Sequence, residues 1–107
     1  MIELDRDNYE AETAQEGQPI LVDFWGEKCG PCLALMPAVE KLEEEYSGKL
    51  KLAKVDAYKN RMLCARLRVL GLPTYIVYKD GNELARITGE DTTIDQIKSA
   101  VNSALAE

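Results

Sequence analysis

The chain has 107 residues, of which 46% are hydrophobic and 30% are charged, and this balance predicts one globular domain that spans residues 1–107. Thirteen basic residues against nineteen acidic ones give a formal net charge of −6, which argues against a phosphate-binding surface and so against a nucleic-acid partner. The chain contains no histidine, which excludes the usual general base and the commonest zinc ligand.

The first eighteen residues are acidic and lack the apolar segment of a signal peptide, and no apolar run approaches the ~20 residues that cross a bilayer. We therefore expect a cytoplasmic protein without membrane contact. Since no long apolar seam suggests an obligate dimer, we also expect a monomer.

Near the start of the chain, Ile2–Leu4 predicts a short edge strand. An acidic helix is expected from about Asp7 to Glu16, ended by Gly17 and Pro19.

The run Ile20–Trp25 is almost continuously apolar, which is typical of a central strand covered on both faces by helices. After it, apolar residues recur at helical spacing and glutamates occupy the other side, which predicts a long amphipathic helix. Pro37 is expected to bend this helix, because proline lacks a backbone N–H and its ring crowds the preceding turn. The apolar positions of the helix are Leu35, Val39, Leu42 and Tyr46.

The second half of the chain continues to alternate strands and helices. Leu50–Asp56 predicts a strand, Asn60–Leu67 a short helix, and the aromatic and β-branched run Tyr75–Tyr78 another strand. Asp80-Gly81 predicts the turn of a hairpin whose second arm is Glu83–Thr88.

A last helix is expected near the end of the chain, because Thr93 and Gln96 have the spacing of a capping box. Its apolar face would consist of Ile94, Ile97, Val101 and Leu105. The resulting order of elements predicts an α/β fold, in which a mixed sheet of about five strands lies between four helices.

The three cysteines are Cys29, Cys32 and Cys64, and this odd, low number argues against a structural disulfide framework. Cys29 begins the long helix, where free N–H groups and the positive end of the helix dipole favour its thiolate, so it is expected to attack. Cys32, one turn inward, is more shielded and is expected to be the resolving thiol. Between them, Gly30 tolerates the tight turn and Pro31 fixes φ.

Two other interpretations of the Cys-x-x-Cys pair remain open at this stage, a structural disulfide and half of a zinc site. Cys64 is expected to face the core from the short helix, since a free cysteine is usually a small buried hydrophobe. The alternative for Cys64 is a regulatory thiol.

The segment from Trp25 to Cys32, between an apolar strand and an amphipathic helix, resembles the thioredoxin family. The resemblance covers essentially the whole chain and implies the thioredoxin fold and a protein that reduces disulfides in other proteins. Its further matching features are Val22-Asp23-Phe24-Trp25, Pro37, Leu72-Pro73-Thr74, Lys79-Asp80-Gly81 and Gly89.

Asp23 lies in the most apolar strand, where an unpaired carboxylate is costly to bury. Burial would raise its pKa and leave a carboxyl group able to exchange a proton near neutral pH. An Asp at a strand edge facing water is the alternative. The resemblance implies that Asp23 accepts the proton of Cys32 and that Lys54 is its charge partner.

The resemblance also implies a cis peptide bond between Leu72 and Pro73, and an apolar groove that binds an extended client segment. For Trp25, plain core packing is the alternative. Three positions around the motif depart from the family's usual pattern, and they put the identity of the clients and of the reductase in question: Lys28, Leu33 and Glu90. The residues expected to line the groove are Trp25, Lys28, Gly71, Leu72, Pro73 and Gly89.

We therefore expect a thiol-disulfide oxidoreductase whose Cys29 and Cys32 cycle between dithiol and disulfide. The chain carries no FAD or nicotinamide motif such as G-x-G-x-x-G, and we expect no cofactor and no metal. A separate thioredoxin reductase would therefore supply the electrons with which this protein reduces its client proteins. The alternatives are a dedicated electron carrier for one partner enzyme and a non-catalytic binding module built on the same fold.

Overall fold

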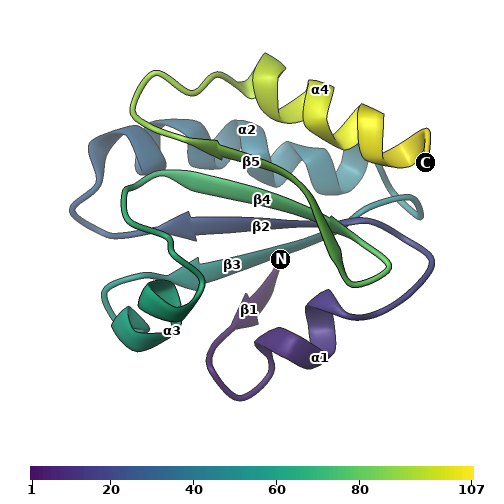
Figure 1. Cartoon of the computed structure of the whole chain (residues 1–107). Helices are drawn as coiled ribbons and strands as arrows, with labels where there is room; N and C mark the ends of the chain where they lie inside the picture. Colours follow the sequence, from purple (N-terminus) through teal and green to yellow (C-terminus); the bar gives the residue numbers. More distant parts are fainter.

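In the computed structural model, which describes all 107 residues, the apolar strands form one five-stranded sheet in the order β1-β3-β2-β4-β5 (Figure 1). β3 pairs in parallel with β1 and β2, whereas β4 pairs antiparallel with β2 and β5. β2 is therefore central and β1 lies at an edge, as predicted. The strands are β1 (Ile2–Leu4), β2 (Ile20–Trp25), β3 (Lys51–Asp56), β4 (Thr74–Lys79) and β5 (Asn82–Thr88).

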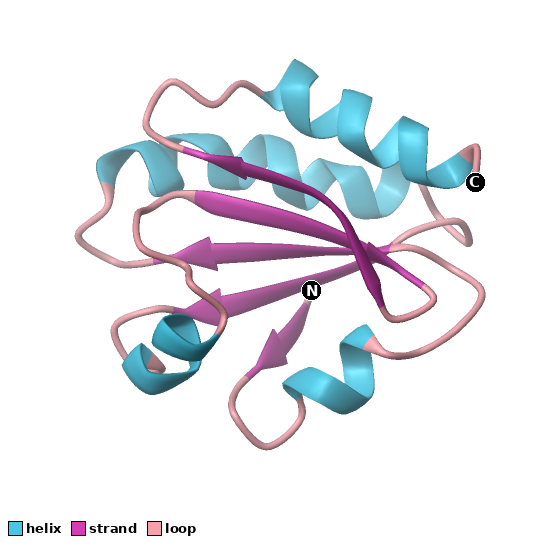
Figure 2. Cartoon of the chain, viewed as in Figure 1, coloured by secondary structure: helices cyan, strands magenta, loops and turns pink.

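Four helices cover the two faces of the sheet, with α2 and α4 on one face and α1 and α3 on the other (Figure 2). This arrangement confirms the expected mixed sheet between helices. No helix has the length and apolar character needed to cross a bilayer. The helices are α1 (Tyr9–Thr13), α2 (Gly30–Glu45), α3 (Arg61–Arg66) and α4 (Ile94–Leu105).

The alternation of side chains along the strands produces two separate cores. In β2, Val22 and Phe24 pack toward α1 and α3, whereas Leu21 packs toward α2 and α4. Asp23 points to the same face as Leu21, because side chains two residues apart share a face. This alternation places a carboxyl group beneath α2. The buried residues that α2 and α4 contribute to their core are Val39, Leu42, Ile97, Val101 and Ala104.

The helix signals expected in α2 and α4 are found in the structure, whereas the range predicted for the first helix is not. Thr93 and Gln96 form both hydrogen bonds of the capping box at the start of α4. Pro37 lies inside α2, which continues past it to Glu45, and the bend expected there stays a prediction.

The first helix is much shorter than its predicted range of Asp7 to Glu16. The Asp5 carboxylate accepts hydrogen bonds from the N–H groups of Asp7 and Asn8, and the Asn8 side chain accepts one from the Asp5 N–H. These bonds hold a local turn, so α1 begins only at Tyr9. Its end is early because Ala14 to Glu16 are exposed and contribute no apolar contact. The predicted range was therefore wrong at both ends.

Candidate active site

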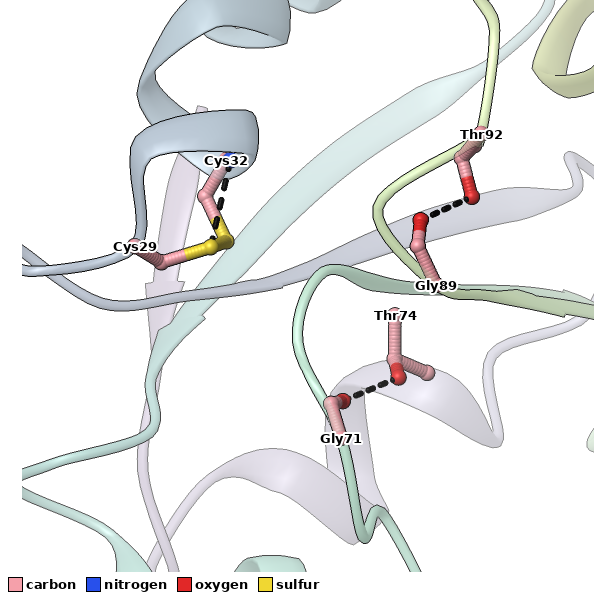
Figure 3. The surroundings of a disulfide bond; sticks show 6 residues. All are labelled: Cys29, Cys32, Gly71, Thr74, Gly89 and Thr92. Atoms are coloured by element: carbon pink, nitrogen blue, oxygen red, sulfur yellow. Dashed lines mark hydrogen bonds between the residues drawn. A yellow bond between two sulfur atoms is a disulfide. The ribbon is translucent and has the colours of Figure 1, made fainter.

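Cys29 is the N-cap residue of α2, and its extended backbone (φ −92°, ψ 99°) turns the chain from the loop into the helix. Gly30 begins the helix and Pro31 stands in its first turn, where a missing N–H does no harm. The Cys32 N–H donates a hydrogen bond to the Cys29 sulfur at 3.2 Å (Figure 3). This bond places a helix N–H group against the sulfur, where it can stabilise negative charge.

Cys29 and Cys32 are joined by a disulfide, with their Cα atoms 5.3 Å apart. The two sulfurs differ in access, because Cys29 is partly exposed whereas Cys32 is 0% exposed. An incoming thiol or disulfide can therefore reach Cys29 and not Cys32. No cluster of three or more potential metal-ligating side chains is formed anywhere in the chain.

Asp23 is 1% exposed, so the water-facing alternative for this residue is wrong. Burial raises the pKa of its carboxyl group from 3.8 to about 7, and the positive charge of Lys54 opposes part of that rise. Neither carboxylate oxygen has a hydrogen-bond partner within the chain. Asp23 is thus a buried carboxyl group that can hold or release a proton near neutral pH.

Lys54 lies directly opposite Asp23 in the pairing of β2 with β3. Its ammonium nitrogen is 5.6 Å from the ring centroid of Trp25, within the range of a cation–π contact. Trp25 is half-buried, so it has both a packed side and an accessible side. The structure therefore brings together three of the predicted site residues, Asp23, Lys54 and Trp25, at the carboxyl end of β2.

Tyr75 is a neighbour of Asp23 that sequence reasoning missed. The antiparallel pairing of β2 with β4 places Tyr75 opposite Asp23, on the same face of the sheet. Its side chain is buried, and its hydroxyl has no hydrogen-bond partner within the chain. Burial raises the pKa of the Tyr75 hydroxyl, and the nearby Asp23 charge raises it further. Only the register of the two strands reveals this neighbour, and the sequence pattern does not specify that register.

Four of the expected groove residues lie in two loops that are braced against each other (Figure 3): Gly71, Leu72, Pro73 and Gly89. The peptide bond between Leu72 and Pro73 is cis, and the Gly89 N–H donates to the Pro73 carbonyl at 3.0 Å. Gly71, Leu72 and Gly89 are partly exposed, and Gly89 has φ +120°, which favours glycine. Two threonine hydroxyls hold these loops: that of Thr74 donates to the Gly71 carbonyl at 2.6 Å, and that of Thr92, which the sequence did not indicate, donates to the Gly89 carbonyl at 2.7 Å.

The three residues that depart from the usual family pattern, Lys28, Leu33 and Glu90, are all exposed. Lys28 forms no ion pair within the chain.

Cys64 is only 7% exposed and unpaired, which confirms the prediction that it faces the core. Burial raises the pKa of the Cys64 thiol, and Asp56 adds to the rise.

The loop after β3 packs against the loop that leads to Cys29, a contact that the sequence did not predict. A side chain on Gly26 would place its Cβ 2.8 Å from the ring of Tyr58. The Ala57 N–H also donates to the Trp25 carbonyl at 2.8 Å. A glycine is therefore needed at position 26 for Tyr58 to cover the motif loop.

Comparison with known proteins agrees with this geometry. The sequence profile of the thioredoxin family matches residues 1–103. A thioredoxin of Acetoanaerobium sticklandii is 43% identical over 101 residues, which cover 94% of this chain and 96% of that protein. A thioredoxin of Peptoclostridium acidaminophilum is 36% identical over 101 residues, with 94% and 92% covered. The chloroplastic thioredoxin X of Arabidopsis thaliana is 39% identical over 82 residues, with 77% and 45% covered.

Proposed function

Because the chain belongs to the thioredoxin family and is a thiol-disulfide oxidoreductase, we propose that it reduces disulfides in client proteins with Cys29 as attacking thiol and Cys32 as resolving thiol. The observation that carries this assignment of roles is the Cys29–Cys32 disulfide at the N-terminus of α2, with one sulfur accessible and the other buried.

In the first step, the thiolate of Cys29 attacks one sulfur of the client disulfide. The client S–S bond breaks, a mixed disulfide forms with Cys29, and the departing client sulfur takes up a proton. The partial exposure of Cys29 and the Cys32 N–H that points at its sulfur support this role. The groove around Trp25, Leu72 and Gly89 holds the client segment during this step.

In the second step, Cys32 gives its proton to the carboxylate of Asp23, and the resulting thiolate attacks the sulfur of Cys29. The mixed disulfide breaks, the client sulfur departs and takes up a second proton, and the client leaves with both sulfurs reduced. The client gains two electrons and two protons, and the protein is left with its Cys29–Cys32 disulfide. A carboxyl group with a pKa of about 7 suits this transfer, because both of its protonation states are populated at neutral pH. Lys54 limits the rise of that pKa.

The oxidised protein then needs two electrons, which we assign to a separate thioredoxin reductase. The chain would work in the cytoplasm, since a disulfide reductant acts where thiols are kept reduced. We further propose that residues 1–107 act as one domain and as a monomer.

A coupled assay of insulin reduction tests the proposal. The protein should accelerate reduction first with dithiothreitol as electron donor and then with a candidate reductase and its nucleotide. The variant Cys29→Ser should be inactive with both donors. If the native protein failed with dithiothreitol, the proposed chemistry would be refuted, whereas failure with the reductase alone would concern only the choice of electron donor.

A dedicated carrier that serves one enzyme is the second candidate, and the exposed departures Lys28, Leu33 and Glu90 around the motif favour it. A panel of unrelated disulfide clients separates the two candidates. Broad turnover supports the general reductant, and turnover of one client alone supports the carrier. A non-catalytic module would instead bind its partner unchanged after Cys29 and Cys32 are both replaced by serine.

A further inference from the structure

Four ionisable side chains stand at the same level of four neighbouring strands. Glu3 of β1 is paired with Lys54 of β3, which is paired with Asp23 of β2. Asp23 is in turn paired with Tyr75 of β4. Directly paired residues share a face of the sheet, so all four side chains point to the same face. The row leads from the exposed Glu3 through the half-buried Lys54 to Asp23 and Tyr75, which are each 1% exposed.

Lys54 links the buried Asp23 to an open hollow at the carboxyl ends of β1, β2 and β3. The hollow has a volume of about 550 Å³, and Trp25, whose ring centroid lies 5.6 Å from the Lys54 ammonium, lines it as well. Lys54 forms no ion pair with any carboxylate. Its charge therefore acts both on Asp23 and on the carboxylates of the hollow. The charged residues that line the hollow are Glu3, Asp5, Glu27, Asp56, Lys54 and Lys59.

Glu3 is the carboxylate of the hollow that is best placed to attract Lys54. It is directly beside Lys54 in the sheet, where neighbouring strands are only about 4.7–4.9 Å apart. Asp5 and Asp56 are less available, because one oxygen of each already accepts two N–H bonds from its own loop. Glu27 follows the end of β2 and has no strand partner. The Glu3 carboxylate forms no ion pair, so nothing else holds its charge.

We propose that Glu3 is a positioning residue for the proton transfer, because its carboxylate competes with Asp23 for the ammonium group of Lys54. Attraction by Glu3 draws the positive charge toward the hollow and away from the buried carboxyl group. The anion of Asp23 is then stabilised less, and Asp23 holds the proton that it accepts more firmly. The inference rests on the proposed function, in which Asp23 accepts the proton of Cys32.

The direction of the effect follows from the groups that face Asp23. Burial raises the pKa of Asp23, and the Lys54 charge opposes part of that rise. Tyr75 is neutral at pH 7, since burial raises the pKa of its hydroxyl. The charged residues of α2 and α4 are exposed, except for Lys98, which pairs with Glu45. Lys54 is therefore the cation that controls Asp23, and removing the Glu3 charge should let it lower the pKa of Asp23 further.

NMR titration of the Asp23 carboxyl carbon in the oxidised protein tests the electrostatic part. Glu3→Gln should lower the pKa of Asp23 by roughly 0.2 to 0.7, as expected for the loss of one exposed charge. Glu3→Asp keeps the charge and should retain most of the native value. Glu10→Gln is the matched control, because it removes an exposed and unpaired carboxylate from α1 with the same change in net charge. It should leave the pKa of Asp23 within about 0.1 of the native value.

Two further measurements connect Glu3 to Lys54 and to the reaction. With Lys54→Gln already in place, adding Glu3→Gln should change the pKa of Asp23 by less than about a third of the shift seen with Lys54 present, since the two residues are coupled. Rapid mixing of the reduced protein with an excess of a disulfide peptide measures the release of reduced peptide. The pH midpoint of this step should move to lower pH in Glu3→Gln, by as much as the carboxyl pKa moves, and stay in place in Glu10→Gln.

An unchanged Asp23 pKa in Glu3→Gln, an equal shift in Glu10→Gln, or the full shift without Lys54 would overturn the proposal and leave the proposed function intact. A lower pKa with an unmoved pH midpoint of release would also overturn it, because Glu3 would then have no effect on the proton transfer. If the native protein released no reduced peptide at any pH, the proposed function would fail, and the role of Glu3 in it would fail as well.

Discussion

Replacing the buried carboxyl group of Asp23 by an amide is the most informative perturbation of this fold. In the folded chain burial raises the pKa of Asp23 from 3.8 to about 7, so folding favours the protonated form. Below the lower value both folded and unfolded chains carry the proton, and the ionisation of the carboxyl group does not affect stability. Above the higher value both are ionised, and the folded chain holds a buried charge that Lys54 compensates only in part.

The size of the effect follows from the two pKa values. At ~1.4 kcal/mol per pKa unit, the difference between 3.8 and about 7 corresponds to a destabilisation of up to ~4 kcal/mol at alkaline pH. The stability of the native protein should therefore fall as the pH rises from about 4 to about 7 and then level off. Asp23→Asn should remove this slope, so its advantage should be near zero at about pH 4 and reach ~2–4 kcal/mol at about pH 8.

Urea unfolding of the oxidised proteins at a series of pH values measures this difference directly. Asp91→Asn is the matched control, because Asp91 is exposed and forms no hydrogen bond or ion pair through its side chain. Its effect on stability should stay within ~0.5 kcal/mol throughout. A gain for Asp23→Asn of the same size at about pH 4 and at about pH 8 would refute the reasoning, since it would not come from ionisation.

Three further changes test other parts of the structure. Cys32→Ser should trap Cys29 in mixed disulfides with client proteins while Cys29→Ser traps almost none, and equal capture by the two variants in mass spectrometry would contradict the assigned roles. Lys54→Gln should move the pKa of Asp23 further above about 7, because the Lys54 charge lowers it, and an unchanged carboxyl titration by NMR would exclude Lys54 as the charge partner. Thr93→Ala removes the capping box of α4 and should lower the free energy of unfolding by ~1 kcal/mol in urea melts, whereas a loss below ~0.3 kcal/mol would mean that the box contributes little.

The sequence by itself determined the order of the elements and the place of the reactive sulfurs. The apolar run of β2, the helical spacing in α2 and the capping box of α4 are local patterns, and in these three elements the local pattern indicated the observed structure. The short distance between Cys29 and Cys32 likewise follows from their separation along one helical turn. The limits of α1 were missed because its start depends on side-chain hydrogen bonds between Asp5 and Asn8, and its end on the exposure of Ala14 to Glu16.

Only the tertiary structure decided what surrounds the sulfurs. Asp23 meets Lys54 and Tyr75 through pairing between strands that lie about thirty or more residues apart, and a shift of one residue would send each side chain to the other face. The contact of Tyr58 with Gly26 arises in the same way, from loops that meet at the carboxyl ends of β2 and β3. The sequence could show that a buried carboxyl group needs compensation, and the family resemblance named Lys54 as its charge partner. Only the register of the sheet shows that Lys54 and Tyr75 both lie opposite Asp23.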